Sequence, residues 1–396
     1  MKMYDVEKML PGAYIFQCPK RIIFGNNSMN QYGAEVKRLN SKYPLIVTDK
    51  GVISAGLIDK LKAPLEKEKI KYEIYDGALP DAPIRTVEEG LEIVKKNKHD
   101  LIIGFGGGSS IDTAKAISIM ATAEKDISHC FGIETVEKPG LPKIFTPTTA
   151  GTGSELSSAY NCFDEKTGDK RTGYSRFSFA DVAIVDPTLT LTMPQKLTAE
   201  TGIDALSHAL ECYVTAKSNP FSEMFAYKGI QTISRYIRRA YAKGQDDLES
   251  RYFMSLGVHG GTLCIRCGGT GACHALAYPL AVKYHLSHGL SIAVMLPYVM
   301  EYNLIGNLEK YANVAQAMGE RVEGLSVFDA AYRSVEAMKR LLQDLSLPLR
   351  LREVGAKKED FQTFSETVFK LYKHHINNNP RDMQVEDVRK VYENAW

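Results

Sequence analysis

The chain has 396 residues, of which 44% are apolar and 24% are charged. These fractions are close to those of globular proteins and exclude wholesale disorder. The 49 basic and 47 acidic side chains leave a net charge of +2, which gives no electrostatic reason to expect nucleic acid or an anionic membrane as a partner. At roughly 150 residues per domain, the length predicts two or three domains.

The sequence also indicates a compartment. No apolar run approaches the roughly 18 to 20 residues that a bilayer span needs. Residues 1–17 mix charged and apolar side chains without a continuous apolar stretch, so we expect no secretory signal there. The 7 cysteines are odd in number and scattered, which argues against a disulfide framework. We therefore predict a cytoplasmic protein.

The first half of the chain alternates between strand and helix patterns. We predict strands at residues 43–49, 72–75, 101–105, 141–146 and 182–185. Helices are predicted between them at residues 56–69, 83–98 and 111–123. Short apolar strands separated by helices are typical of a parallel sheet covered on both faces, so we predict an α/β domain with a mostly parallel sheet.

The pattern changes near residue 188. From residue 198 onward, helical periodicity dominates, with helices predicted at residues 199–215, 221–242, 249–264, 308–318, 327–345 and 358–373. A switch of this kind marks a domain boundary. We therefore predict an α/β domain over residues 1–188 and an all-α domain over residues 189–396.

Three consecutive glycines, Gly106, Gly107 and Gly108, follow a predicted strand and precede a predicted helix. Glycines let the backbone approach a ligand closely, and a helix N-terminus offers free N–H groups to phosphate. The run is not the G-x-G-x-x-G fingerprint, because Ser109 stands where the third glycine belongs, and no Walker A sequence follows. A turn that only packs is the alternative, but the order strand, glycines, helix favours phosphate binding.

Two more turns follow predicted strands. Asp49 ends the first strand, where a carboxylate can bind a ribose hydroxyl and repel a 2′-phosphate, although it could equally be an ordinary turn residue. Residues 146–155 form a turn rich in hydroxyls and glycine that includes Thr148 and Thr149. Such turns cap helices as often as they bind ligands. In a doubly wound sheet, however, both turns would lie at the carboxyl edge, where ligands bind.

Asp204 and His208 are four residues apart in a predicted helix and therefore share a face. His274 falls in a second helical stretch, and His288 follows it. Three imidazoles and one carboxylate suit a divalent ion such as Fe(II) or Zn(II), with a position left open for substrate. Spacing alone leaves the alternative that each histidine is an isolated polar group.

Together, these motifs resemble those of the iron-containing, group III alcohol dehydrogenases. The resemblance covers essentially the whole chain. The similar segments are residues 106–115, 148–155, 186–187, 201–211, 274–279, 288–289 and 379–396.

The resemblance implies an NAD-dependent, metal-containing alcohol dehydrogenase that moves a hydride between NAD(H) and a small alcohol or aldehyde. Its active site would lie in a cleft between the α/β and helical domains. The implied metal ligands, for Fe(II) or alternatively Zn(II), are Asp204, His208, His274 and His288. The implied cofactor positions are Asp49, Gly106, Gly107, Gly108, Ser109, Asp112, Thr148, Thr149, Lys170 and Leu189.

Two positions depart from the family pattern. Tyr278 stands where the family usually has a second histidine that takes part in proton transfer. A phenol with a pKa near 10 is a poorer relay than an imidazole near 6.5, so we expect protons to pass through water or the cofactor ribose. Arg266 replaces a small or polar residue. A fixed cation beside the substrate would favour an aldehyde with an anionic tail, with sulfoacetaldehyde, reduced to isethionate, as the specific hypothesis.

Several alternatives stay open at this point. Arg266 could instead form a structural ion pair in an enzyme for ethanol, propanediol or butanol. A dehydroquinate-synthase-like lyase, a glycerol-phosphate dehydrogenase or a non-enzymatic binding protein are further alternatives. The turn at residues 148–155 and the helix at residues 204–211 argue against the first two, and the four occupied metal positions argue against the third. Residues 13–17, paired with residues 21–24, resemble family segments that join across a dimer, so a homodimer is expected.

Overall fold

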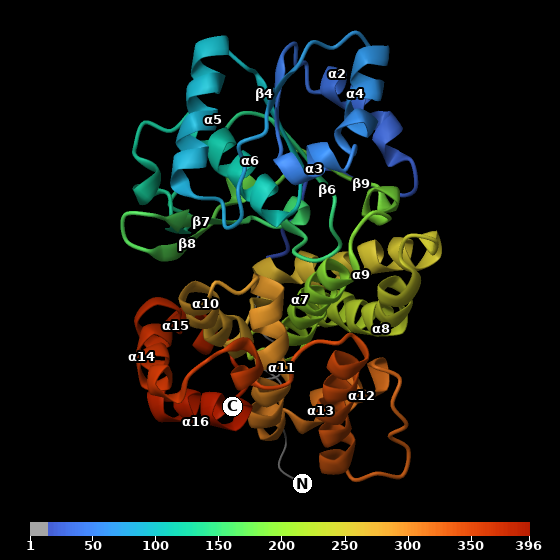
Figure 1. Ribbon diagram of the computed structural model, residues 1–396, viewed down its shortest axis with the longest axis vertical. Helices are drawn as coiled ribbons and strands as arrows, with labels where there is room; N and C mark the ends of the chain where they lie inside the picture. Colours follow the sequence, from blue (N-terminus) through green and yellow to red (C-terminus); the bar gives the residue numbers. More distant parts are fainter. Residues whose placement is uncertain (1–14) are drawn as a thin grey trace, which may run out of the picture.

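The computed structural model describes residues 15–396. Two parts follow one another along the long axis of the molecule (Figure 1). The first, coloured blue to green, is built around a sheet, and the second, coloured from the green of α7 to red, consists of helices. The predicted fold class, a parallel α/β domain followed by an all-α domain, is therefore confirmed.

The main sheet has six strands, all parallel, in the order β1-β9-β6-β4-β2-β3. In chain order the strands are β1 (Ile22–Phe24), β2 (Pro44–Val47), β3 (Glu73–Tyr75), β4 (Leu101–Gly106), β6 (Lys143–Pro147) and β9 (Val182–Val185). The helices around them are α2 (Tyr32–Arg38), α3 (Lys50–Ser54), α4 (Ile58–Lys67), α5 (Ile84–Asn97) and α6 (Gly108–Met120).

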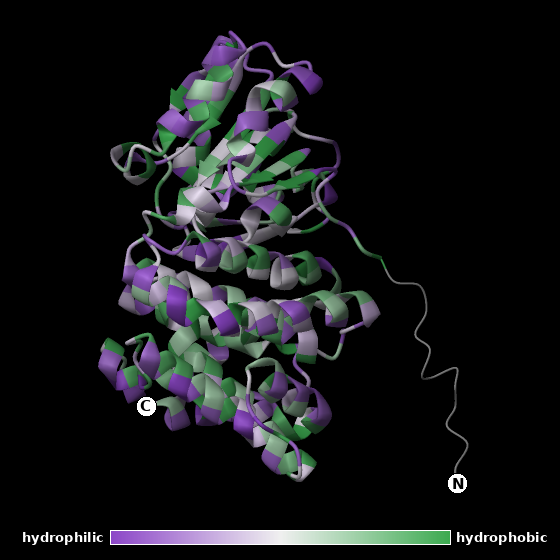
Figure 2. Ribbon diagram, turned by 90° about the vertical axis from the view of Figure 1, so that its right-hand side faces the viewer, coloured by the Kyte–Doolittle hydropathy of each residue, from purple (hydrophilic) through white to green (hydrophobic). Residues whose placement is uncertain are grey.

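Both faces of this sheet are buried. In β2, Leu45 and Val47 join an apolar cluster with α5 and α6, whereas Ile46 joins a second cluster with α2 and α4. Successive side chains of a strand point to opposite faces, so a strand buried on both sides is apolar throughout. Figure 2 shows this as green strands beneath helices of mixed green and purple. The continuous apolar runs made these strands predictable.

A second, smaller sheet was not predicted. It consists of β5 (Gly132–Ile133), β7 (Ala159–Asp164) and β8 (Asp169–Tyr174), with β7 and β8 forming an antiparallel hairpin. Only alternate residues of β7 are buried, and β8 is half-exposed along most of its length. The hairpin depends on pairing between the two strands more than on an apolar run, so the sequence pattern was weak.

The pairing expected near the N-terminus is not seen between the described residues of one chain, and as a contact across a dimer it stays a prediction. Ile22–Phe24 forms β1 and pairs in parallel with β9, while residues 15–17 are in no strand. Residues 13 and 14 lie outside the described part of the chain. The homodimer, which we based on that pairing, stays a prediction.

The second part of the chain is helical. Its longer helices are α7 (Gln195–Val214), α8 (Pro220–Lys243), α9 (Leu248–Gly268), α10 (Ala272–Tyr284), α11 (His288–Asn303), α12 (Leu308–Ala317), α13 (Val327–Asp344), α14 (Phe361–Leu371) and α16 (Val385–Ala395), with the short α15 (Lys373–Ile376) between the last two. The boundary placed near residue 188 stays a prediction; β9 ends at Val185 and α7 begins at Gln195.

One helical stretch contradicts our expectation that no apolar segment approaches the length of a bilayer span. His288–Gly306 spans 19 residues with a mean hydropathy of 1.2, which is long and apolar enough to cross a membrane by length and composition. However, 67% of it is buried inside the protein, where α11 packs against α7, α10, α13 and α16. A helix that is apolar on every side is as typical of a protein core as of a membrane.

Candidate active site

A cleft of about 950 Å³ lies between the carboxyl edge of the main sheet and the start of α7. The turns after β2, β4 and β6 form one wall, and Met193, Pro194 and Thr201 contribute to the other. The predicted cofactor residues that line this cleft are Asp49, Gly107, Gly108, Ser109, Thr148 and Thr149. The sheet therefore gathers three turns that are far apart in sequence at its ligand-binding edge.

The glycine loop leaves space for a ligand. Gly106 has a φ of +155°, and a Cβ there would lie 2.7 Å from the Ser110 hydroxyl oxygen, so a larger residue would be strained and would force Ser110 to shift. A Cβ on Gly107 would meet nothing closer than Thr149, at 3.7 Å. The space beside Gly107 therefore belongs to the cleft. Because α6 begins at Gly108, its first N–H groups are available to a phosphate there.

Asp49 is held in a fixed orientation at this edge. One carboxylate oxygen accepts a hydrogen bond from the main-chain N–H of Val52 at 3.0 Å, and thereby caps α3. The other accepts from the Ser110 hydroxyl at 2.7 Å. A carboxylate has about four lone-pair sites, so both oxygens can still accept a further hydrogen bond from a ribose hydroxyl in the cleft.

Four predicted cofactor residues do not line the cleft, namely Gly106, Asp112, Lys170 and Leu189. Asp112 is buried, and its carboxylate accepts from the Ser154 hydroxyl at 2.5 Å and from the main-chain N–H of Asn161 at 3.1 Å. The second of these bonds ties α6 to β7 of the hairpin. Leu189 is fully buried in the core against the sheet, where it has no access to the cleft.

Lys170 is linked to the glycine loop through Asp81 and does not line the cleft. Its ammonium lies 2.7 Å from an Asp81 carboxylate oxygen, and the main-chain N–H of Asp81 donates to the Ser109 hydroxyl at 3.1 Å. The Lys170 charge also lowers the pKa of His288, after the larger effect of burial. Lys170 therefore lies between the glycine loop and the histidine cluster.

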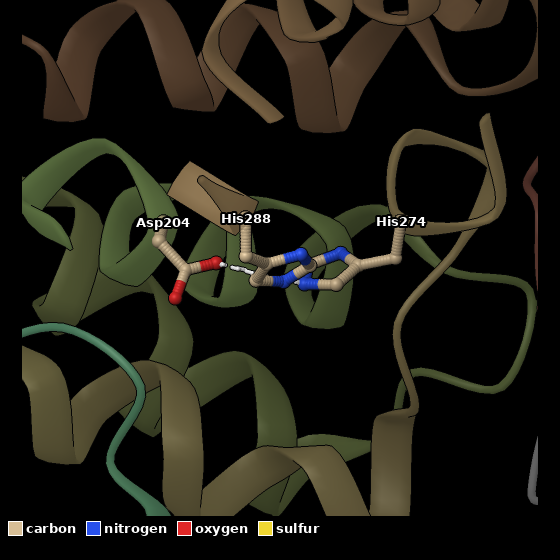
Figure 3. Close-up of side chains that lie close together, drawn as sticks. All are labelled: Asp204, His274 and His288. Carbon is tan, nitrogen blue, oxygen red and sulfur yellow. Dashed lines mark ion pairs between the residues drawn. The ribbon is translucent and has the colours of Figure 1, made fainter. Parts of the chain in front are cut away.

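The four predicted metal ligands converge. Asp204 and His208 come from α7, His274 from α10, and His288 is the first residue of α11. The Asp204 Oδ1 atom lies 3.9 Å from Nε2 of His208, 3.8 Å from Nε2 of His274 and 3.5 Å from Nε2 of His288. Figure 3 shows the Asp204, His274 and His288 side chains pointing toward one another.

The donor atoms of this cluster lack protein partners. Asp204 Oδ1 and His274 Nε2 are buried and accept or donate no hydrogen bond within residues 15–396. Leaving such atoms unpartnered costs roughly 1 to 3 kcal/mol each, which a bound cation would offset. Asp204, His274 and His288 each offer one ligand atom, and these three atoms lie within 4.8 Å of one another. The His208 ring stacks on His274 at 4.7 Å, so this residue borders the same centre.

The protonation states suit a metal. Burial lowers the pKa of His208 to about 4, and burial with the nearby Lys170 charge lowers that of His288 to about 3. Burial opposes ionisation of Asp204, but the three facing imidazoles hold its pKa below the ordinary value. At neutral pH His208 and His288 are therefore neutral imidazoles and Asp204 is a carboxylate, the forms that bind a divalent ion, whereas Glu211 raises the pKa of His274.

Glu211 is a functional residue that sequence analysis did not single out. One of its carboxylate oxygens lies 2.5 Å from His274 Nδ1, and the other accepts from the main-chain N–H of Cys273 at 2.7 Å. A carboxylate on Nδ1 fixes the proton there and leaves the Nε2 lone pair for the metal. The available signal was the spacing, because Asp204, His208 and Glu211 share one face of α7.

The two residues that depart from the family pattern have different surroundings. The Tyr278 ring stacks on His288 at 5.6 Å, and burial raises its pKa well above 10, so the phenol keeps its proton at neutral pH. Arg266 donates to Glu134 at 2.5 Å, and Arg176 pairs with the same carboxylate at 3.2 Å. The structural ion pair, which was the alternative for Arg266, is therefore present.

Comparison with known proteins agrees with this geometry. Residues 19–187 match the family model of iron-containing alcohol dehydrogenase, and residues 198–396 match that of the Fe-containing alcohol dehydrogenase family, C-terminal. The chain belongs to the iron-containing alcohol dehydrogenase family. As a member of this family it is an oxidoreductase of the alcohol dehydrogenase class, which uses NAD(H) and a divalent metal.

Individual relatives of this alcohol dehydrogenase cover nearly its whole length. It is 37% identical to long-chain-alcohol dehydrogenase 1 of Geobacillus thermodenitrificans, over 95% of this chain and 96% of the relative. It is 34% identical to sulfoacetaldehyde reductase of Bilophila wadsworthia, over 93% of this chain and 95% of the relative. The crystal structure of a 1,3-propanediol oxidoreductase superposes with a TM-score of 0.95, at 35% identity, over 97% of this chain and 100% of that one.

Proposed function

We propose that this chain catalyses reversible hydride transfer between NAD(H) and a short primary alcohol or aldehyde at a metal bound by Asp204, His208, His274 and His288. The observation that carries the proposal is the convergence of three Nε2 atoms on Asp204 Oδ1 within 3.5 to 3.9 Å. A divalent ion in this position supplies a Lewis acid that lowers the pKa of an alcohol and polarises a carbonyl.

The surrounding residues have distinct tasks in this proposal. The loop at Gly107 and Gly108 binds the cofactor phosphates, and Asp49 accepts hydrogen bonds from the ribose. Thr148 and Thr149 close the same wall of the cleft. Glu211 orients His274. Tyr278 packs over His288 and limits the access of water to the ligand, while its phenol stays protonated.

The test is turnover of the purified protein loaded with Fe(II) or, in parallel, Zn(II). We expect NADH to be consumed in the presence of short aldehydes and activity to be lost after treatment with a chelator. Consumption of NADH also separates this function from a lyase that regenerates its own cofactor. Failure of both metal-loaded forms to oxidise NADH with any short aldehyde would refute the proposal.

A substrate with an anionic tail, with sulfoacetaldehyde as the specific case, is the second candidate. It is favoured by a pocket of about 130 Å³ that is lined by Lys217, Arg266 and Thr270. Glu134 is shared by Arg266 and Arg176, so one carboxylate faces two guanidinium groups and leaves an excess of positive charge. A sulfonate would have to compete with Glu134 for Arg266.

We further propose that the enzyme is a homodimer and that it acts in the cytoplasm. We also propose that its two domains meet near residue 188. All seven cysteines are free thiols, as expected in a reducing compartment. Light scattering of the purified full chain tests the dimer. A monomer at the concentrations used for turnover would contradict it.

A further inference from the structure

His375 is a buried imidazole that none of the sequence motifs includes. It lies in the short helix α15, and only 2% of its surface is exposed. Its ring centroid is 5.8 Å from that of Tyr278 and 6.4 Å from that of His274. His375 therefore lies beside His274, one of the proposed metal ligands, on the side where Tyr278 replaces an imidazole.

The two nitrogens of His375 have different surroundings. Nδ1 lies 2.8 Å from the Thr270 hydroxyl and 3.4 Å from the Thr270 carbonyl oxygen. A carbonyl oxygen can only accept, which favours the proton on Nδ1 and leaves a lone pair on Nε2. Nε2 is buried and has no hydrogen-bond partner in the described part of the chain. A buried acceptor of this kind requires an explanation, such as a missing ligand or water.

The charge state keeps this lone pair available. Burial, with the neighbouring His374 and His274, holds the pKa of His375 well below 6.5. At neutral pH the ring is therefore an uncharged acceptor whose orientation is set by Thr270. Thr270 therefore holds the His375 ring in place at Nδ1 and leaves Nε2 free to bind another group.

We propose that Nε2 of His375 accepts a hydrogen bond from a second hydroxyl of the substrate and thereby makes the enzyme selective for diols and hydroxyaldehydes. This inference rests on the proposed function, in which the metal binds the reacting oxygen and leaves His375 free for another group. An alkyl analogue would leave Nε2 buried without a partner. A site built to bind a hydroxyl rejects the analogue that lacks it far more strongly than an apolar pocket rejects an extra methylene.

The experiment compares aldehydes that differ only by hydroxyl against methyl, namely glycolaldehyde with propanal and 3-hydroxypropanal with butanal. We expect the metal-loaded wild type to favour the hydroxylated member of at least one pair by about 10- to 100-fold in kcat/KM. His375→Leu should bring that ratio close to one, chiefly by loss on the hydroxyaldehyde. Metal content and activity on the alkyl aldehyde should change little. Absence of a preference in the wild type, or an equal loss on both members in the variant, would overturn the inference.

The same substitution at the neighbouring, exposed residue, His374→Leu, is the matched control and should keep the wild-type ratio. Thr270→Val removes the hydroxyl that holds Nδ1 without a change in side-chain size. Thr270→Val should partly lower the ratio of kcat/KM for the hydroxyaldehyde to kcat/KM for the alkyl aldehyde. It is the test variant if His375→Leu does not fold. If Tyr278→Phe abolishes the preference while His375→Leu keeps it, the tyrosine, and not His375, recognises the hydroxyl.

The outcomes separate this inference from the proposed function. Turnover of propanal and butanal without a hydroxyl preference would refute the role of His375 and leave the dehydrogenase intact. If no aldehyde is reduced, equilibrium binding of ethylene glycol and 1-propanol to the metal-loaded protein with NADH still decides. Tighter binding of the diol that is lost in His375→Leu supports the subsite, and equal binding of both alcohols overturns it.

Discussion

A carboxylate oxygen of Glu211 lies 2.5 Å from Nδ1 of His274, and both side chains are buried. This contact links α7 to α10 and raises the pKa of His274 against the opposing effect of burial. The contact fixes the Nδ1–H tautomer and turns Nε2 toward Asp204, whose Oδ1 is 3.8 Å away. One helix therefore carries two of the proposed ligands, Asp204 and His208, and orients a third from a neighbouring helix.

The first prediction concerns this pair. Glu211→Gln should weaken metal binding by about 10- to 100-fold, because a neutral amide holds the imidazole less firmly than a carboxylate. Competition with a chelator of known affinity measures the change. Glu223→Gln, at a partly buried position on α8 that pairs with Lys310 at 2.8 Å, is the control. An unchanged metal affinity in Glu211→Gln would remove this residue from the centre.

The second prediction concerns the ligand itself. His274→Ala should abolish turnover and lower bound metal by at least about the same 10- to 100-fold, because one of four ligands is gone. Metal analysis of the purified variant measures this directly. His285→Asn is the control, since His285 is exposed and has a φ of 52° that asparagine tolerates. Full activity with a normal metal content in His274→Ala would contradict the assignment.

The third prediction concerns cofactor choice. Asp49 should disfavour NADPH, because its carboxylate would face the 2′-phosphate. Asp49→Asn removes the charge but keeps an oxygen that can cap α3, so the preference for NADH over NADPH should narrow without loss of stability. Asp49→Gly should narrow it too, but at a cost of a few tenths of a kcal/mol or more from the weakened cap. Equal use of both cofactors by the wild type would refute the role of Asp49.

The fourth prediction tests the anionic tail. If Arg266 binds a sulfonate, Arg266→Ala should lower kcat/KM for sulfoacetaldehyde by about 10- to 150-fold and leave butanal nearly unaffected. Arg176→Ala removes the other partner of the same Glu134 carboxylate, so it should also lower kcat/KM for sulfoacetaldehyde if the excess positive charge binds the sulfonate. A wild type that prefers butanal, or an equal loss on both aldehydes, would leave Arg266 as a structural partner of Glu134.

The fifth prediction is a dependence of stability on pH. Glu155 is buried, and this burial raises its pKa from 4.5 to about 7. The folded state therefore holds the proton of Glu155 more tightly than the unfolded state does. Below pH 4.5 both states are protonated, and the titration of Glu155 does not change the free energy of unfolding. As the pH rises, ionisation of Glu155 lowers the free energy of unfolding, by about 3 kcal/mol above pH 7.

Glu155→Gln removes this titration. The variant should match the wild type in acid and be more stable above about pH 7, as measured by urea unfolding at a series of pH values. A wild type whose stability relative to Glu155→Gln does not change between acid and neutral pH would show that Glu155 titrates normally.

Local pattern in the sequence was enough for most of the fold. The strands β2, β4 and β9 are apolar at every position, so their burial on both faces was readable from the residues themselves. The glycine loop and the Asp204–His208 spacing are also local features, since each lies within one turn or one helix. These parts could be predicted because neighbours in sequence are neighbours in space. The hairpin β7–β8 could not, since it depends on strand pairing and not on an apolar run.

Only the tertiary structure decided which side chains meet. The Glu211–His274 contact spans 63 residues and the Arg266–Glu134 contact spans 132, and neither separation leaves a periodic signal. The same packing directed Asp112 to the hairpin, buried Leu189 in the core and brought His375 beside Tyr278. Residue type and spacing determined what chemistry the chain carries. Helix packing determined which of those groups share a site, because contacts between distant segments form only when their buried faces come together.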